Sequence, residues 1–406
     1  MDVTNTETTD VLAASAWSVD ASLAIPGPRS PADVGGFYRP ELDGLRFLAF
    51  IAVYMQHTIG FGIAGNHQHL PNWLGDLFGT IGLAGTFGVD LFFVLSSYLI
   101  TELLLRERVM TGVLDVKAFY IRRMLRIWPL YFLFIVFAYG FAFAIPGEEL
   151  TWRHLLGYFL FAGNWVYFLI PVTTVAGPLW SVSLEEQFYL VWPWLMRGAS
   201  ERRLVQFAGA LMIFAMAARL AMGIVHPGDD WVSKNSFTRV DGIAVGALLA
   251  LTLNGGVPQW RAGTRAALAA ACVLVLLWIA YTFGLFEPPV RLPQLMFGWA
   301  FAAIACGGLL LSVLGDAGPF TALLRSRPFI YLGRISFGLY VYHELLLTVG
   351  APLFPLHDSS ASQMAAYWLF GLAGSIVMAA ASYRWLELPF LRLKRQRFTV
   401  VESRRD

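Results

Sequence analysis

The feature that most constrains this chain is a succession of apolar runs between residues 43 and 386, each long enough to cross a lipid bilayer. A bilayer core about 30 Å thick requires about 20 apolar residues in a helix. Of the 406 residues, 57% are hydrophobic and 14% are charged, whereas about 25% are charged in a typical soluble domain. Because lipid cannot satisfy backbone N–H and C=O groups, such runs form helices. The sequence therefore predicts an all-α polytopic protein whose main partner is the lipid bilayer.

Basic residues between the apolar runs predict which loops face the cytoplasm, because short cytoplasmic loops are enriched in Lys and Arg. The predicted spanning helices are 43–62, 83–105, 127–146, 178–197, 203–225, 238–253, 264–284, 293–314, 329–350 and 363–386. Residues 153–170 are also apolar. If this segment crossed the membrane, the basic clusters before and after it would lie on opposite sides. If it does not cross, all of the basic clusters lie on the same side. We therefore predict ten transmembrane helices, both termini in the cytoplasm, and a re-entrant or surface helix near 153–170 on the outer side.

The two ends of the chain differ from the apolar body. Residues 1–36 contain five acidic residues and no long apolar run, which is wrong for a signal peptide and typical of a disordered cytoplasmic tail. Residues 391–406 are basic and predict a second cytoplasmic tail. Cys272 and Cys306 lie inside apolar runs, so they are expected to be buried thiols rather than a disulfide or metal site. No metal and no nucleic-acid partner is expected.

The first apolar run carries three ionisable residues, Asp43, Arg46 and His57. Such residues in hydrocarbon usually pair or serve a site. Eleven residues separate Arg46 from His57, so on a helix they project about 20° apart and lie about 16 Å apart along the axis. A cation and an imidazole placed in this way could span an extended, partly anionic substrate. The alternative is that Asp43 neutralises Arg46 at the interface and that His57 is a satisfied polar group at the helix end.

Residues 115–126 are predicted to form a short basic helix at the cytoplasmic surface, with Arg122, Arg123 and Arg126 close together. One interpretation is an anchor on anionic lipid headgroups. The other is a cradle for a phosphorylated cofactor, because guanidinium groups match the geometry of phosphate oxygens.

Polar residues recur in the later apolar runs as well. They are Asp90, Ser96, Trp180, Ser183, Glu185, Glu186, Arg239, Asp241, Ser336, Tyr340 and His343. Each alone could pair with an opposite charge or hydrogen-bond a neighbouring helix. Because unpaired polar groups in lipid cost several kcal/mol each, an aqueous cavity for a polar substrate explains them together. A histidine beside carboxylates is suited to general-base acyl transfer. Adjacent helical residues project about 100° apart, so one of Glu185 and Glu186 is expected to face the site.

Several of these segments resemble the acyltransferase-3 family of integral membrane acyltransferases, which includes bacterial O-antigen and exopolysaccharide O-acetylases. The resemblance covers most of residues 38–386, and it predicts one acyltransferase-3 transmembrane domain over 37–390. The matching segments are Arg39-Pro-Glu-Leu-Asp-Gly-Leu-Arg46, the Arg46/His57 pair, Gly88-Val-Asp-Leu-Phe-Phe-Val-Leu-Ser96, Arg123-x-x-Arg126-Ile-Trp-Pro129, Leu179-Trp-Ser-Val-Ser-Leu-Glu-Glu-Gln-Phe-Tyr-Leu190, Arg239-Val-Asp241 and Leu332-Gly-Arg-Ile-Ser336.

The resemblance implies an enzyme of the bacterial inner membrane that moves an acyl group, usually acetyl, from cytoplasmic acyl-coenzyme A to a hydroxyl of a lipid-linked or surface glycan. By the same resemblance, His57 is the catalytic base or acyl carrier, with Arg46, Glu185 and Glu186 as further candidate catalytic residues. Arg46, Arg122, Arg123 and Arg126 are candidate coenzyme A contacts. The candidate substrate-binding residues are Asp43, Asp90, Ser96, Trp180, Ser183, Arg239, Asp241, Ser336, Tyr340 and His343.

Two alternatives stay open at the level of sequence. Within the same enzyme class, the acceptor could be a small secondary metabolite such as a macrolide. In another class, buried charges could mark the path of a transporter or flippase for a polar lipid-linked substrate. A transporter predicts paired inverted repeats, and no internal repeat of fixed period is evident in this sequence.

Overall fold

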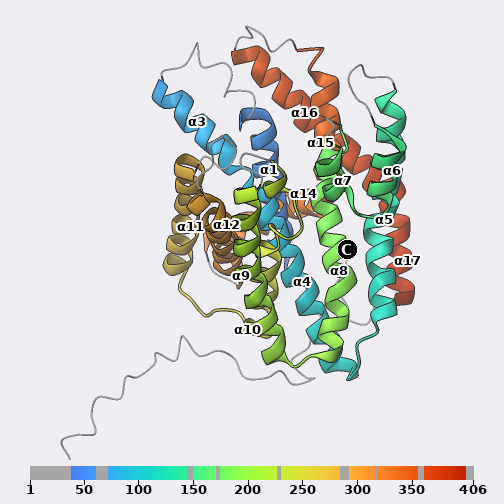
Figure 1. The fold of residues 1–406 in the computed structure, drawn as a ribbon, viewed down its shortest axis with the longest axis vertical. Helices are drawn as coiled ribbons and strands as arrows, with labels where there is room; N and C mark the ends of the chain where they lie inside the picture. Colours follow the sequence, from blue (N-terminus) through green and yellow to red (C-terminus); the bar gives the residue numbers. More distant parts are fainter. Residues whose placement is uncertain are drawn as a thin grey trace, which may run out of the picture.

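The computed structural model of the chain describes residues 38–60, 72–143, 150–170, 174–225, 230–283, 292–315, 318–354 and 361–398. These residues form helices joined by turns, with no β-strand among them, which confirms the predicted all-α class. Figure 1 shows the helices gathered into one bundle. The α-helices are α1 (Pro40–Met55), α3 (Asn72–Ala84), α4 (Phe87–Thr111), α5 (Val116–Ala142), α6 (Trp152–Phe159), α7 (Gly163–Leu169), α8 (Trp180–Gly198), α9 (Glu201–Val225), α10 (Asp241–Leu253), α11 (Ala262–Phe283), α12 (Leu292–Val313), α13 (Pro319–Leu324), α14 (Arg327–Arg334), α15 (Ser336–Gly350), α16 (Ala361–Ser382) and α17 (Leu388–Phe398).

Six helical stretches of the described chain are long and apolar enough to cross a membrane. The expected number was ten, so the sequence overestimated it. The helices α1, α10 and α15 contain 16, 13 and 15 residues, and at 1.5 Å per residue each is shorter than a hydrocarbon core about 30 Å thick. Helix α8 has 19 residues but carries Glu185, Glu186 and Arg197. In this protein an apolar run in the sequence therefore corresponds to a helix, but that helix is not always long and apolar enough to cross the membrane.

The segment 153–170 folds as two short helices, α6 and α7, of eight and seven residues. Between them Phe161 has a φ of 52°, a left-handed conformation that interrupts a regular helix. Neither helix reaches 15 Å at 1.5 Å per residue. The prediction that this segment is not a crossing helix agrees with the structure, although two helices replace the single one expected.

Helices α1 and α4 lie at the centre of the hydrophobic packing. Phe50 and Phe93 belong to one cluster of buried side chains, and Leu45 and Leu95 belong to a second. The two helices approach so closely that a Cβ on Gly88 would lie 2.4 Å from a backbone oxygen of α1. Protein therefore covers much of each helix, and polar residues such as Asp90 and Glu102 on α4 are buried.

The turn between α4 and α5 places the arginines at the start of α5. Helix α4 ends at Gly112, whose φ of 73° suits a glycine at a helix C-terminus. Asp115 caps α5 by accepting a hydrogen bond from the backbone N–H of Ala118 at 2.9 Å. An ion pair of 2.5 Å between Arg122 on α5 and Glu107 on α4 links the two helices.

The first part of the basic C-terminal stretch, up to Phe398, belongs to helix α17. It packs beside α5 (Figure 1), and Arg122 donates a hydrogen bond of 3.1 Å to the backbone oxygen of Phe398. The predicted tail of residues 1–36 and the last residues, 399–406, lie outside the described part of the chain.

Candidate active site

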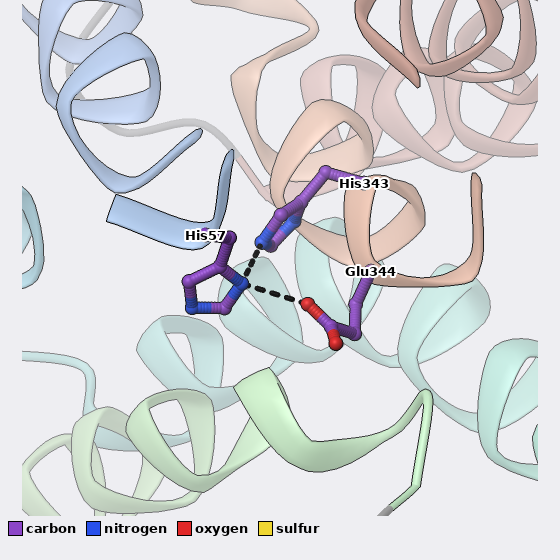
Figure 2. A group of neighbouring side chains, drawn as sticks. All are labelled: His57, His343 and Glu344. Carbon is purple, nitrogen blue, oxygen red and sulfur yellow. Dashed lines mark hydrogen bonds and ion pairs between the residues drawn. The ribbon is translucent and has the colours of Figure 1, made fainter. Parts of the chain in front are cut away.

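His57 lies just after α1, in the π-helical turn Gln56–Gly60, and faces two residues of α15 (Figure 2). Its Nδ1 lies 2.7 Å from Oε2 of Glu344 and 3.2 Å from Nε2 of His343. The His343 side chain is fully buried, whereas the side chains of His57 and Glu344 are 22% and 32% exposed. The imidazole of His57 is therefore both held by partners and accessible.

The hydrogen-bond partners fix the protonation pattern of the neutral imidazoles. His343 Nδ1 lies 2.7 Å from the backbone oxygen of Tyr340, and because a carbonyl oxygen can only accept, this nitrogen carries the proton. Nε2 of neutral His343 is then an acceptor. His57 Nδ1 consequently donates to Glu344 and to His343, which leaves the lone pair of neutral His57 on Nε2. A carboxylate at this distance also stabilises the imidazolium that forms when Nε2 takes up a proton.

A second group of polar side chains lines a cavity of about 100 Å³. The cavity lies among α1, α4, α5, α8 and α15, and the charged residues on its wall are Arg46, Arg123, Arg126 and Glu185. Three guanidinium groups and one carboxylate make it a positively charged site. The other lining residues are Phe92, Ser96, Ile127, Ser181, Val182, Tyr189, Ser336, Phe337 and Tyr340.

Glu185 and Glu186 point in different directions. Glu185 lines the cavity and accepts a hydrogen bond of 2.8 Å from the hydroxyl of Tyr189. Since that hydroxyl has one proton, Ser96 donates its own to Tyr189. Glu186 instead accepts a hydrogen bond of 3.2 Å from the indole of Trp128. The structure thus places Glu185 at the cavity and Glu186 against α5, which the sequence had left open.

Arg46 and His57 do not line the same cavity in this conformation. Among the described lining residues Arg46 is present and His57 is not. Tyr340 joins the two groups, because its side chain lines the cavity and its backbone oxygen holds His343. The expected shared pocket is replaced by two adjoining groups connected through α15.

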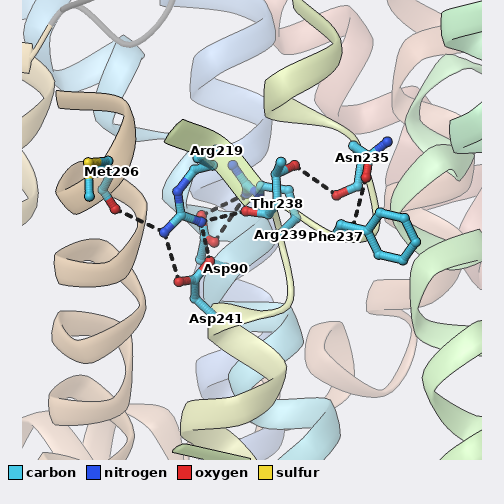
Figure 3. Close-up of polar contacts among 8 residues, drawn as sticks. All are labelled: Asp90, Arg219, Asn235, Phe237, Thr238, Arg239, Asp241 and Met296. Atoms are coloured by element: carbon cyan, nitrogen blue, oxygen red, sulfur yellow. Dashed lines mark hydrogen bonds and ion pairs between the residues drawn. The ribbon is translucent and has the colours of Figure 1, made fainter. Parts of the chain in front are cut away.

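Asp90, Arg239 and Asp241 form a separate buried network with Arg219 (Figure 3). Arg239 contacts both carboxylate oxygens of Asp90 at 3.1 and 3.0 Å. Arg219 contacts both oxygens of Asp241, at 2.5 and 3.0 Å. Arg219 also donates to the backbone oxygen of Met296 on α12 at 3.0 Å. These paired charges tie α4, α9, α10 and α12 together, as the ion-pair alternative to substrate binding expects.

The remaining candidates have local partners. Asp43 lies 3.5 Å from Arg46, and Ser183 donates a hydrogen bond of 3.3 Å to the backbone oxygen of Leu179. The ring centroid of Trp180 lies 6.2 Å from that of Phe93. Ser336 lines the cavity.

Sequence analysis missed three residues that the structure brings into these groups. Glu344 follows His343 directly in the chain, and no role was predicted for it. Tyr189 completes the hydrogen-bond chain to Glu185, and Arg219 is a lone arginine within the apolar run 203–225. The cost of an ionisable group in lipid was the signal available for Glu344 and Arg219.

A helical body with six membrane-length helices in its described part, a histidine bound to a carboxylate and an adjoining cationic cavity has features that an integral membrane group-transfer enzyme requires. A family model described as an acyltransferase domain matches residues 39–384. The chain belongs to this acyltransferase-3 family, which confirms the resemblance seen in its motifs.

Two relatives illustrate the similarity. The chain is 27% identical, over 87% of its length, to the peptidoglycan O-acetyltransferase OatA of Listeria monocytogenes, of which it covers 56%. It is 23% identical, over 91% of its length, to the O-acetyltransferase OatA of Staphylococcus aureus, of which it covers 60%. The chain thus spans somewhat more than half the length of these relatives. No solved structure matches it.

The buried charge network predicts that Asp90→Asn destabilises the protein. Neutralising one member of a buried ion pair strands the other, at a cost of about 3–5 kcal/mol. We expect a lower thermal midpoint in detergent, measured by tryptophan fluorescence. The control is Glu201→Gln, which removes the 48% exposed partner of Arg108 and should cost less than about 1 kcal/mol. A midpoint for Asp90→Asn equal to that of the control would contradict a structural role for the network.

Proposed function

We propose that this chain is a membrane O-acyltransferase that moves an acyl group, acetyl in the first instance, from acyl-coenzyme A to a hydroxyl of a glycan. The observation that carries the proposal is the 2.7 Å contact between His57 Nδ1 and Glu344. It leaves the lone pair of neutral His57 on Nε2, the ring nitrogen that contacts neither Glu344 nor His343, and stabilises the charge that the imidazole gains on accepting a proton. Because the chain belongs to the acyltransferase family, we infer that this general base serves acyl transfer.

In the proposed reaction, His57 Nε2 takes the proton of the acceptor hydroxyl while the hydroxyl oxygen bonds to the thioester carbonyl carbon. The carbon–sulfur bond then breaks, and the imidazolium returns its proton to the departing coenzyme A thiolate. General-base assistance of this kind contributes about 10²–10⁴-fold to a rate. Direct transfer needs one fewer covalent intermediate than a route through an acyl-histidine, and Glu344 would stabilise the positively charged ring in either route.

His343 and Glu344 act as positioning residues in this scheme. Glu344 holds the Nδ1 proton of His57, and His343 offers a second acceptor to the same proton at 3.2 Å. The backbone oxygen of Tyr340 in turn fixes the tautomer of His343. Together these contacts favour the tautomer of His57 that carries its proton on Nδ1 and keeps its lone pair on Nε2.

The cationic cavity suits the phosphate groups of coenzyme A. Arg46, Arg123 and Arg126 approach it from two helices, and guanidinium groups bind phosphate oxygens in a bidentate manner. Arg123 pairs with no carboxylate among the described residues and lines the cavity, so its charge is available to a ligand phosphate. The arm of the donor would then follow Tyr340 and α15 toward His57.

The acceptor and the orientation in the membrane follow from different observations. Relatives named peptidoglycan O-acetyltransferases support a cell-wall glycan hydroxyl as the acceptor. The arginines at the start of α5 and the basic helix α17 lie together, and basic segments prefer the cytoplasmic side. We therefore place the donor cavity toward the cytoplasm of a bacterial inner membrane, with both chain ends on that side.

Replacing His57 by alanine tests the base directly. With purified protein in lipid, labelled acetyl-coenzyme A and a peptidoglycan acceptor, we expect His57→Ala to lower acetyl transfer by about 10²–10⁴-fold. His154→Ala is the matched control, because His154 is a buried histidine that caps α6 outside the site. A correctly folded His57→Ala protein with full transfer activity would rule out the mechanism.

Arg123→Ala tests the donor site. The loss of one charge-assisted hydrogen bond, about 1.5–3 kcal/mol, should raise the KM for acetyl-coenzyme A by about 10- to 100-fold and change kcat much less. The control is Arg108→Ala, which removes an arginine that pairs with Glu201 and does not line the cavity. If both variants show the wild-type donor KM, coenzyme A phosphates do not bind in this cavity.

A further inference from the structure

The same three side chains that surround His57 also have the composition of a metal site. Nitrogen atoms of His57 and His343 and an oxygen of Glu344 all lie within 4.8 Å of one another. Two histidines and a glutamate are a ligand set that holds zinc with a fourth position open to water. We propose that this cluster binds a divalent transition-metal ion, zinc in particular, and that the bound ion inhibits acyl transfer.

The spacing of the ligand atoms is close to that of a zinc site. Zinc–nitrogen bonds of about 2.0–2.1 Å in a tetrahedron separate neighbouring ligand atoms by about 3.3 Å. His57 Nδ1 and His343 Nε2 are 3.2 Å apart. The 2.7 Å contact between His57 Nδ1 and Glu344 Oε2 must lengthen by about half an ångström, which a rotation of the partly exposed Glu344 side chain permits (Figure 2).

Two of the three ligands already have the form that a metal requires. His343 donates its Nδ1 proton to the Tyr340 carbonyl, so its Nε2 lone pair faces the cluster. A hydrogen bond from the second nitrogen to a backbone oxygen is the usual way in which proteins orient a metal-binding histidine. The buried position of His343 fixes this ligand, while the exposed fractions of His57 and Glu344 give an ion access.

Only His57 must change its tautomer. Coordination through Nδ1 requires the proton to leave that nitrogen, and in the neutral ring it then resides on Nε2. An imidazole protonated on Nε2 cannot accept the proton of an acceptor hydroxyl. The inhibitory effect therefore rests on the proposed function, whereas the binding of the ion does not.

The first experiment measures zinc binding without donor or acceptor. Purified detergent-solubilised protein is titrated with zinc, and the bound metal is determined by equilibrium dialysis and elemental analysis. We expect one site in the wild type and a loss of affinity of at least about tenfold in His343→Gln and in Glu344→Gln. His154→Gln, which removes a histidine elsewhere, should keep the wild-type affinity. If wild type and all three variants bind zinc alike, or none binds it, the proposed metal site is wrong.

The second experiment measures acetyl transfer with increasing zinc. Wild-type activity should fall as the site fills and recover after addition of a chelator, while the residual activity of His343→Gln should resist the same zinc concentrations. Stoichiometric binding without inhibition would overturn the inhibitory role and would also contradict His57 Nε2 as the base. An absence of binding would leave the proposed acyltransferase function untouched.

Discussion

The hydrogen bond between His57 and Glu344 joins two segments that are 287 residues apart in the chain. It requires that α1, which ends in a π-helical turn, meets α15 across the hydrophobic core. Burial of Phe50 and Leu339 in the same cluster of apolar side chains brings these helices together. The side chains of His57 and Glu344 are 22% and 32% exposed, so the contact is partly shielded from water, which strengthens it relative to a fully exposed pair. Packing of the first helix thus determines the tautomer of the histidine and, with it, the chemistry available.

The ionisable residues inside the bundle divide into two groups with different surroundings. Arg219 and Arg239 are buried with carboxylates that contact them through both oxygens, so their charges are satisfied by the protein. Arg123 instead pairs with no carboxylate in the described chain; its guanidinium carbon lies 5.7 and 5.8 Å from the ring centroids of Phe119 and Tyr189, beside a cavity. Because a charge without a partner is costly in lipid, the first group suits the joining of helices and the second suits an anionic ligand.

The sequence predicted the helical membrane class, the absence of a crossing helix at 153–170 and the segments that supply polar groups, because each follows from composition and charge along the chain. It could not predict how charges pair. Asp241 lies two residues from Arg239, yet Arg239 pairs with Asp90, which is 149 residues away, and Asp241 pairs with Arg219. Arg239 precedes α10, whose first residue is Asp241, and the partner of each charge depends on tertiary packing. The predicted number of spanning helices was too high for a related reason, because an apolar run in the sequence does not show where the helix ends.

The most direct measurement of the central claim is the kcat of Glu344→Gln for acetyl transfer, with glutamine retaining the size of the side chain and losing its charge. If Glu344 orients His57 and stabilises its imidazolium, kcat should fall by about 10²-fold or more, with an unchanged KM for acetyl-coenzyme A and an unchanged thermal midpoint. A wild-type kcat in this folded variant would show that the carboxylate does not assist His57.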